Sequence, residues 1–414
     1  MKAEPRASHP LGPPSARDRG SVRRTNLALA LRLLRDQGPL SRSRIAASTG
    51  LPKPTVTSLV AELVDLGLAA EGPTQREGAV GRPGTLVHID GRHICGIGVE
   101  ISSHYIHVLA LALDGATTFE HRTALTAADT AADTVLDLTA RTLARCTAAL
   151  EQAGARAVGT AVAVPGVIDT PTGTVRYAPA LGWRNVHVTE GLRHRLGTTT
   201  PALTLDNDAK LGALAEYAHE HAQVADMVCI TGQSGIGAGI ISGGRLLRGA
   251  AGFAGEVGHM PLDPQQRPCV CGRTGCWETM VGLDALLHLA ADPDDHLHDP
   301  GVELEHRLTV LHERAVAHDA RTLEALERVA DALGLGIALL ADVLNPGRVV
   351  LGGYFTHIGD LILDRVRAAV DQRVMAPDGG GCEVALSPLG FTAAARGGAH
   401  LALDAVYQDP GAAL

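Results

Sequence analysis

From Asp90 onward the sequence alternates between strand-like and helical segments in two successive rounds. In the first round, residues 129–154 have the apolar spacing of a long amphipathic helix. Its strand-like segments are rich in apolar and β-branched residues and comprise 93–101, 105–113 and 157–168. The second round begins near Ala202 and continues through residues 227–249. Two α/β halves of similar size predict two lobes with a ligand-binding cleft between them.

The residues before Asp90 predict a different, helical unit. Apolar residues recur at helical spacing from Leu27 to Leu34 and stop at Gly38, which predicts a helix of about three turns. Ser41 is a suitable N-cap for a second short helix, and Gly50 can adopt the positive φ needed to end it. A third helix follows, with an apolar stripe formed by Val56, Leu59, Val60, Leu63 and Leu66.

Three helices in this order predict a helix-turn-helix, whose last helix enters the DNA major groove with its N-terminal residues facing the bases. The candidate DNA-contacting residues at that position are Lys53, Thr55, Thr57 and Ser58. Turn residues and short alternation over 68–90 predict a two-stranded wing, and Arg82 would reach the minor groove from its tip. The alternative is a helical bundle that docks protein partners.

Net charge favours DNA as the partner of this unit. Residues 1–82 carry a net charge of +6, whereas the whole chain is at −9. The N-terminal 20 residues are rich in Pro, Arg and Ser and lack the apolar stretch of a secretory signal, so we expect a disordered leader. With no apolar run of membrane-spanning length, we expect a cytoplasmic protein.

Three of the seven cysteines lie within eight positions of the second lobe. With His259 they form a Cys₃His set typical of tetrahedral structural zinc, namely His259, Cys269, Cys271 and Cys276. Gly272 and Gly275 give the chain the freedom to wrap around one ion. Four protein ligands leave no open position, so we expect Zn²⁺ to be structural; the alternative is a set of reduced, unligated thiols.

Acidic residues surround this cluster. Glu256 lies three residues before His259, and Glu278 follows the last cysteine by two. Asn207 and Asp208 end a predicted strand, where ligand-facing residues of open α/β sheets gather. Carboxylates with an amide are natural partners for sugar hydroxyls, although a single acid here could also be a solvated surface group.

Two of these segments resemble the signature of the ROK family, which contains sugar-responsive repressors and sugar kinases. They are EVGHMPLD, from Glu256, and CVCGRTGCWE at 269–278. Other segments look like the repressor branch, which includes xylose and N-acetylglucosamine repressors: GRPG, LDNDAKLGALAE, APALGWRNV and LGGYF. The resemblance covers nearly the whole chain. It implies an α/β fold with an N-terminal winged helix-turn-helix and a two-lobed, actin- and hexokinase-like (ribonuclease H-like) domain.

Carried over by position, the resemblance implies a zinc site formed by the Cys₃His set. It also implies a sugar site at Asn207, Asp208, Glu256, His259 and Glu278, in which His259 serves metal and ligand together. The residue matching Asp208 is the general base in the kinases of the family. Those kinases carry an Asp-x-Gly-Gly-Thr phosphate loop where this chain has VEISSHY at 99–105, and Ala180 replaces a frequent Asn. Loss of both glycines, with Glu100 added, predicts that phosphoryl transfer is lost and that no residue is catalytic.

We therefore expect a sugar-responsive transcriptional repressor without enzymatic activity. The expected domains are a leader (1–20), a winged helix-turn-helix (21–88), lobe 1 (89–204, completed by a helix at about 391–408) and lobe 2 (205–390) with the zinc site. The expected partners are double-stranded operator DNA, a sugar effector and a second copy, as a homodimer or a dimer of dimers. A DNA-binding sugar kinase is the alternative function.

Overall fold

The computed structural model describes residues 19–75, 84–126, 130–197, 202–220, 224–233, 235–376 and 382–411. The chain divides into two compact units, one formed by Met1–His88 with Val406–Leu414 and the other by Ile89–Ala405. Of the expected leader, only the last two residues fall within the described ranges. Among the helices in those ranges, none is long and apolar enough to span a bilayer.

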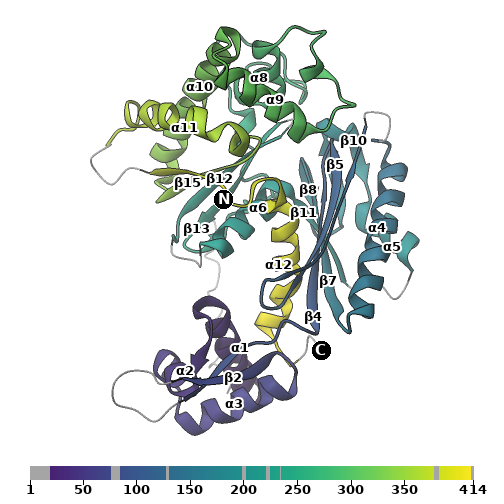
Figure 1. Cartoon of the computed structure of the whole chain (residues 1–414), viewed down its shortest axis with the longest axis vertical. Helices are drawn as coiled ribbons and strands as arrows, with labels where there is room; N and C mark the ends of the chain where they lie inside the picture. Colours follow the sequence, from purple (N-terminus) through teal and green to yellow (C-terminus); the bar gives the residue numbers. More distant parts are fainter. Residues whose placement is uncertain are drawn as a thin grey trace, which may run out of the picture. The chain divides into compact units, whose positions relative to one another are not determined.

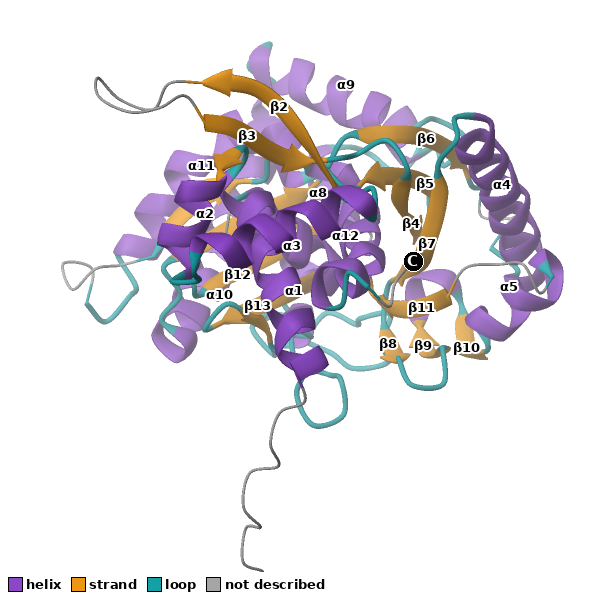
Figure 2. Cartoon of the chain, turned by 90° about the horizontal axis from the view of Figure 1, so that it is seen from below, coloured by secondary structure: helices purple, strands orange, loops and turns teal. Residues whose placement is uncertain are grey.

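In the smaller unit, the described residues up to Ile89 form three helices and a three-stranded sheet of order β1-β3-β2. Its elements are α1 (Arg19–Gln37), β1 (Leu40–Ser41), α2 (Arg42–Thr49), α3 (Lys53–Asp65), β2 (Ala69–Gln75) and β3 (Gly84–Ile89). Figure 2 shows β2 and β3 side by side, as expected for a wing. The helix-turn-helix prediction is confirmed in its element order. The predicted length of the first helix was wrong, because α1 extends back to Arg19 through mostly polar residues, with its one glycine, Gly20, at the very start of the helix.

Two local signals determine how α2 begins and ends. The Ser41 hydroxyl accepts a hydrogen bond from the Arg44 amide at 3.3 Å and so caps the helix. Gly50 ends it with φ 69°, a conformation that costs glycine little because it has no Cβ. The predicted apolar stripe of α3 is buried at Val56, Leu59, Val60 and Leu63.

Lobe 1 of the larger unit is built on a five-stranded sheet of order β11-β7-β4-β5-β6. Strands β4, β7 and β11 are parallel, while β5 and β6 are antiparallel to their neighbours. Helices α4 and α5 cover one face of this sheet and α12 lies on the other (Figure 1). The elements are β4 (Ile94–Ile101), β5 (Tyr105–Ala112), β6 (Thr117–Ala124), α4 (Ala132–Gln152), β7 (Arg156–Val164), β8 (Val167–Asp169), β9 (Thr174–Ala178), η2 (Pro179–Leu181), β10 (Trp183–Val186), α5 (Val188–Leu196) and β11 (Ala202–Asn207). Strand β11 extends to Asn207 and so crosses the boundary between the lobes that was expected at residue 204. Strands β8 to β10 form a small separate sheet.

Lobe 2 repeats this topology in a second five-stranded sheet of order β14-β13-β12-β15-β16. In both sheets the first strand pairs antiparallel with the second and parallel with the fourth, so the two predicted rounds are two copies of one arrangement. The elements are α6 (Asp208–His219), β12 (Met227–Gly232), β13 (Ile236–Ser242), β14 (Arg245–Leu246), η3 (Val257–His259), α7 (Glu278–Val281), α8 (Leu283–Ala290), η4 (His296–His298), α9 (Leu304–Val316), α10 (Ala320–Leu344), β15 (Arg348–Gly353), α11 (Phe355–Asp371), β16 (Glu383–Leu386) and η6 (Gly390–Thr392).

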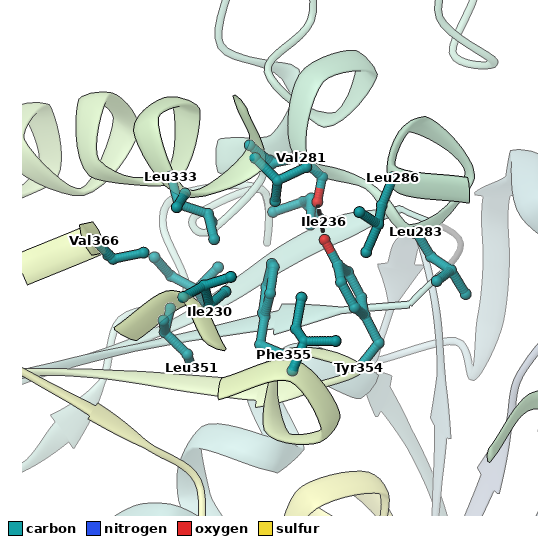
Figure 3. Close-up of a cluster of buried hydrophobic side chains, with 14 of the residues drawn as sticks. Ile230, Ile236, Val281, Leu283, Leu286, Leu333, Leu351, Tyr354, Phe355 and Val366 are labelled. Carbon is teal, nitrogen blue, oxygen red and sulfur yellow. Dashed lines mark hydrogen bonds between the residues drawn. The ribbon is translucent and has the colours of Figure 1, made fainter. Parts of the chain in front are cut away.

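The core of lobe 2 lies between its sheet and helices α8 to α11 (Figure 3). Tyr354 and Phe355 are fully buried there with their ring centroids 4.3 Å apart. The Tyr354 hydroxyl donates to the Val281 carbonyl at 2.6 Å, so its one polar atom is satisfied inside an apolar cluster.

The last helix, α12 (Ala393–Gln408), lies directly against β4 of lobe 1. A Cβ on Gly98 would lie 1.7 Å from the Ala395 carbonyl oxygen, and one on Gly397 would lie 1.7 Å from that of Leu211. Only glycine permits backbones to approach so closely. The chain thus returns from lobe 2 to lobe 1 at Ala393, having first crossed from lobe 1 to lobe 2 at Asp208.

Candidate metal and ligand site

The structure brings the four predicted metal ligands together. One ligand atom from each of His259, Cys269, Cys271 and Cys276 lies within 4.8 Å of the other three. The Cys271 and Cys276 sulfurs are 3.7 Å apart, and Cys269 Sγ is 3.8 Å from His259 Nδ1. A tetrahedral site with arms of about 2.3 Å has corners roughly 3.8 Å apart, so these four side chains could hold a metal ion.

Burial makes two of the thiols harder to ionise, so a metal ion bound here would have to displace a proton from each of them. Burial raises the pKa of the Cys276 thiol and is the largest influence on the Cys269 thiol, whose pKa is also raised. Thiols that resist ionisation become stable thiolates when a cation binds them, because the cation supplies the missing charge.

Asp263 organises the ligand loop, and sequence reasoning missed it. Its buried carboxylate accepts hydrogen bonds from the Gln265 amide, the Arg267 amide and guanidinium, and the Thr279 hydroxyl. Burial would raise its pKa, but these hydrogen bonds lower the pKa to about 2. Nearby, Trp277 Nε1 donates to the Ala332 carbonyl at 2.8 Å and fixes the loop to α10. An Asp followed by Pro, before a cysteine cluster, is the sequence signal for such a turn.

Asn207 and Asp208 lie where the chain leaves β11 and starts α6. The Asn207 amide oxygen accepts from the Lys210 amide and caps α6, while its Nδ2 donates to the Gly166 carbonyl at 3.1 Å. Asn207 is therefore held rigidly and keeps one donor and one acceptor position for a ligand. Burial raises the pKa of Asp208 to about 6, and the negative charge of Glu256 adds to this effect.

Glu256 precedes the short helix η3 that carries His259. Burial raises the pKa of Glu256, His259 and Lys210 oppose this effect, and the negative charge of Glu278 adds to it. Lys210, itself buried, donates through Nζ to the Gly252 carbonyl in the loop before Glu256. Lys210 was also missed; it fixes that loop against α6.

Glu278 lies between the cysteines and β13. Its Oε1 accepts from Cys269 Sγ at 2.7 Å and is 3.4 Å from His259 Nδ1, while Oε2 accepts from the Ile236 amide at 3.4 Å. Its carboxylate therefore faces the metal-ligand group in addition to the acids of the site.

Glu100 occupies the end of β4, and its carboxylate is buried. Its Oε1 accepts from Gln233 Nε2 at 2.7 Å and from the Tyr105 hydroxyl at 2.9 Å. Burial raises the pKa of Glu100 to about 7; the charge of Asp208 adds to the effect and the Gln233 hydrogen bond opposes it. In the first sheet, Glu100 of β4 and Asp206 of β11 both pair with Ala163 of β7, so Glu100 and Asn207 lie at the same edge of that sheet, where its parallel strands end.

The predicted DNA-contacting residues begin the third helix of the smaller unit. Lys53, Thr57 and Ser58 are exposed, and Thr55 is half-buried. The Thr57 hydroxyl donates to the Lys53 carbonyl at 3.0 Å, and Ser58 accepts from Arg23 at 3.3 Å. Arg82 lies outside the described residues.

The fold and the site together define a class: a helix-turn-helix unit joined to a two-lobed α/β domain of the sugar-kinase type with a Cys₃His loop. The model of the IclR helix-turn-helix domain matches residues 26–73. The model of the ROK family matches residues 96–405, and the chain belongs to that family.

Relatives span nearly its full length. The xylose repressor of Caldicellulosiruptor bescii is 30% identical over 359 residues, which cover 85% of this chain and 88% of the repressor. The transcriptional dual regulator NagC of Escherichia coli is 26% identical, with 86% of each chain covered.

Two solved structures share the fold. A ROK family transcriptional regulator, a homolog of the Escherichia coli MLC protein, superposes with a TM-score of 0.74 at 22% identity and covers 94% of this chain and 97% of its own. A ROK family glucokinase from Streptomyces griseus, in complex with glucose and AMPPNP, has a TM-score of 0.64 at 26% identity and covers 75% of this chain and 99% of its own. The predicted fold class is confirmed.

Proposed function

We propose that this protein is a sugar-responsive transcriptional repressor whose two-lobed domain senses a sugar without phosphorylating it. One observation carries the proposal: a helix-turn-helix unit is joined to a two-lobed domain of the sugar-kinase type. The sequence VEISSHY at 99–105, which takes the place of the Asp-x-Gly-Gly-Thr loop expected from the family resemblance, supports the absence of phosphorylation. Two relatives that span most of the chain are named a xylose repressor and a DNA-binding transcriptional dual regulator, in agreement with this function.

The proposed DNA-contacting residues are Lys53, Thr55, Thr57 and Ser58, with Arg82 at the wing. Exposure of Lys53, Thr57 and Ser58 at the start of α3 supports this role, because the first turn of a recognition helix meets the base edges. Operator binding should weaken steeply with salt, since cationic contacts to phosphates release counterions. A flat salt dependence would favour protein docking in place of DNA binding.

The proposed sugar-contacting residues are Asn207, Asp208, Glu256, His259 and Glu278. Their support is the rigid cap at Asn207 and the mutual electrostatic influence of the acids. Carboxylates and a fixed amide accept and donate hydrogen bonds in the pattern that adjacent sugar hydroxyls require.

We further propose that the Cys₃His group binds a structural Zn²⁺. Spacing near that of a tetrahedral site supports zinc, and four protein ligands leave no position for a reacting water. A bound ion would hold the thiolates and the imidazole together and so order the loop that leads to Glu278.

The alternative, a DNA-binding sugar kinase, is favoured by the likeness to the glucokinase and by an Asp208 with a pKa of about 6, suited to accept a proton. Against it stands the buried Glu100 at the end of β4. Phosphoryl transfer relies on positioning and charge neutralisation, and a glutamate side chain in place of the loop glycines takes up space near the phosphates and supplies no positive charge. A coupled assay with ATP and D-glucose, D-xylose or N-acetylglucosamine should detect no turnover.

The proposed coupling follows from linkage. A sugar that prefers one arrangement of the lobes changes DNA affinity, and DNA must change sugar affinity by the same factor. Two-fold operators pair with dimeric helix-turn-helix proteins, so we propose a dimer or dimer of dimers. Operator binding titrated with each of the three sugars tests the coupling; affinity unchanged by all of them would refute it.

A further inference from the structure

Side chains from both lobes meet at the end of β4. Glu100 comes from lobe 1, and Gln233 comes from the turn that follows β12 in lobe 2. Gln233 Nε2 donates to Glu100 Oε1 at 2.7 Å and also approaches the Tyr105 hydroxyl at 3.4 Å. Glu100 and Tyr105 are almost completely buried, so this hydrogen bond between lobes is shielded from water.

A second contact between lobes lies beside the first. Arg122 of β6 forms an ion pair with Glu305 of α9, which belongs to lobe 2. The Arg122 guanidinium carbon lies 3.6 Å from the centre of the Tyr105 ring and 5.6 Å from that of Phe391. A guanidinium placed over an aromatic ring and paired with a carboxylate is held by two independent attractions.

Tyr105 connects these contacts into one group. Its hydroxyl donates to Glu100 at 2.9 Å, one face of its ring carries Arg122, and its edge packs against Phe391 at 6.3 Å between centroids. A displacement of Arg122 should therefore move Tyr105 and, through it, Glu100 and Gln233, although Arg122 forms no hydrogen bond with either of them.

Two buried carboxylate oxygens in this group favour separation of the lobes. Glu100 Oε2 and Glu305 Oε2 are buried, and neither has a hydrogen-bond partner among the described residues. Both oxygens would gain hydrogen bonds to water if the lobes separated, which lowers the cost of opening. Among the described residues, the other connections between the lobes include the two chain crossings, at Asp208 and Ala393, the ion pair of Arg248 with Asp206 and a 3.4 Å hydrogen bond from the Tyr177 hydroxyl to the Val270 carbonyl. None of these involves the end of β4, so the side chains described above are the ones that hold the lobes together there.

We propose that an interlobe latch, made of the chain's own side chains, controls opening of the two-lobed domain. The latch consists of Glu100, Tyr105 and Arg122 of lobe 1 with Gln233 and Glu305 of lobe 2. The latch goes beyond the proposed function, because it acts whichever sugar the protein senses and whether or not it binds DNA.

Hydrogen–deuterium exchange of the full-length protein tests the latch. The Gln233 amide bonds to the Gly235 carbonyl, and the Ser102 amide to the Tyr105 carbonyl, so one peptide from each lobe reports opening. In Arg122→Gln, a change in lobe 1, the peptide containing Gln233 should exchange about ten-fold faster, the loss expected for a charged hydrogen bond. In Gln233→Ala, a change in lobe 2, the peptide at 102–105 should exchange faster to a similar extent.

Arg365→Gln is the matched control. Arg365 of α11 donates two hydrogen bonds of 2.9 Å to Asp331 of α10, so this variant breaks an arginine–carboxylate pair within lobe 2. It should leave both reporter peptides unchanged. The latch is refuted if each latch variant accelerates exchange only in the lobe that carries the substitution, or if Arg365→Gln produces the same acceleration. If Arg122→Gln fails to fold, the Gln233→Ala result decides alone.

Discussion

Replacing Glu100 with glutamine should stabilise the larger unit at alkaline pH and leave it unchanged at acid pH. The folded protein keeps the Glu100 proton up to about pH 7, whereas the ordinary pKa of a glutamate is 4.5. Because the folded state binds the proton more tightly, the free energy of unfolding falls as the pH rises from 4.5 to about 7. Above about pH 7 this contribution is constant. At about 1.4 kcal/mol for each pH unit, the loss by pH 8 is about 3 kcal/mol.

Glutamine removes this loss because it is neutral at every pH. Its carbonyl can still accept from Tyr105 and Gln233, so the variant resembles the protonated wild type. The difference in unfolding free energy between variant and wild type should be near zero at pH 4 and rise to about 3 kcal/mol at pH 8.

Urea unfolding followed by tryptophan fluorescence measures this difference. Trp183 and Trp277 are the two tryptophans of the chain, and both lie in the larger unit, so the signal reports that unit. Glu313→Gln, at an exposed position of α9, is the control and should show no comparable pH dependence. A difference for Glu100→Gln that stays constant from pH 4 to pH 8 would refute the argument that burial holds the proton.

Three further predictions concern other parts of the molecule. Cys276→Ser, or removal of the metal by a chelator, should lower the melting temperature of the larger unit, because structural zinc contributes several kcal/mol to folding. Elemental analysis should show that about one zinc per chain is released. Purified protein without zinc would contradict this prediction. Gly98→Val should destabilise the fold by about 3 kcal/mol or more in chemical denaturation, since its Cβ would lie 1.7 Å from a carbonyl oxygen, whereas Gly212→Ala, with nothing closer than 3.7 Å, should be tolerated. Lys53→Ala should weaken operator binding and reduce the slope of log K against log salt by about one, as measured by fluorescence anisotropy; an unchanged slope would exclude a phosphate contact.

The helix-turn-helix was predictable because its signals are local. A serine at the start of α2 and a glycine at its end act within four residues, and the stripe of α3 is a pattern within one helix. The length of α1 was not predictable from the apolar pattern alone. The first turns of this helix carry mostly polar residues, so the apolar pattern does not show that the helix begins there.

The candidate metal group was predictable for a similar reason. Three of its four ligands fall within eight residues, and the fourth is ten residues earlier, so a single loop can bring them together. The neighbours that support it were not predictable. Asp263, Lys210 and Gln233 act through contacts that depend on how the loop, α6 and the β12–β13 turn pack, and no spacing rule connects them.

By itself, the sequence determined the helix-turn-helix, the α/β class with its two rounds and the set of cysteines, because periodicity, caps and short spacings are properties of neighbouring residues. Tertiary structure decided which distant residues meet. Arg122 and Glu305 are separated by 183 positions, and Glu100 and Gln233 by 133. Such pairs form only when two sheets of the same topology are folded against each other, because the hydrogen bonds and ion pairs depend on distances of a few ångströms that the order of residues does not encode locally.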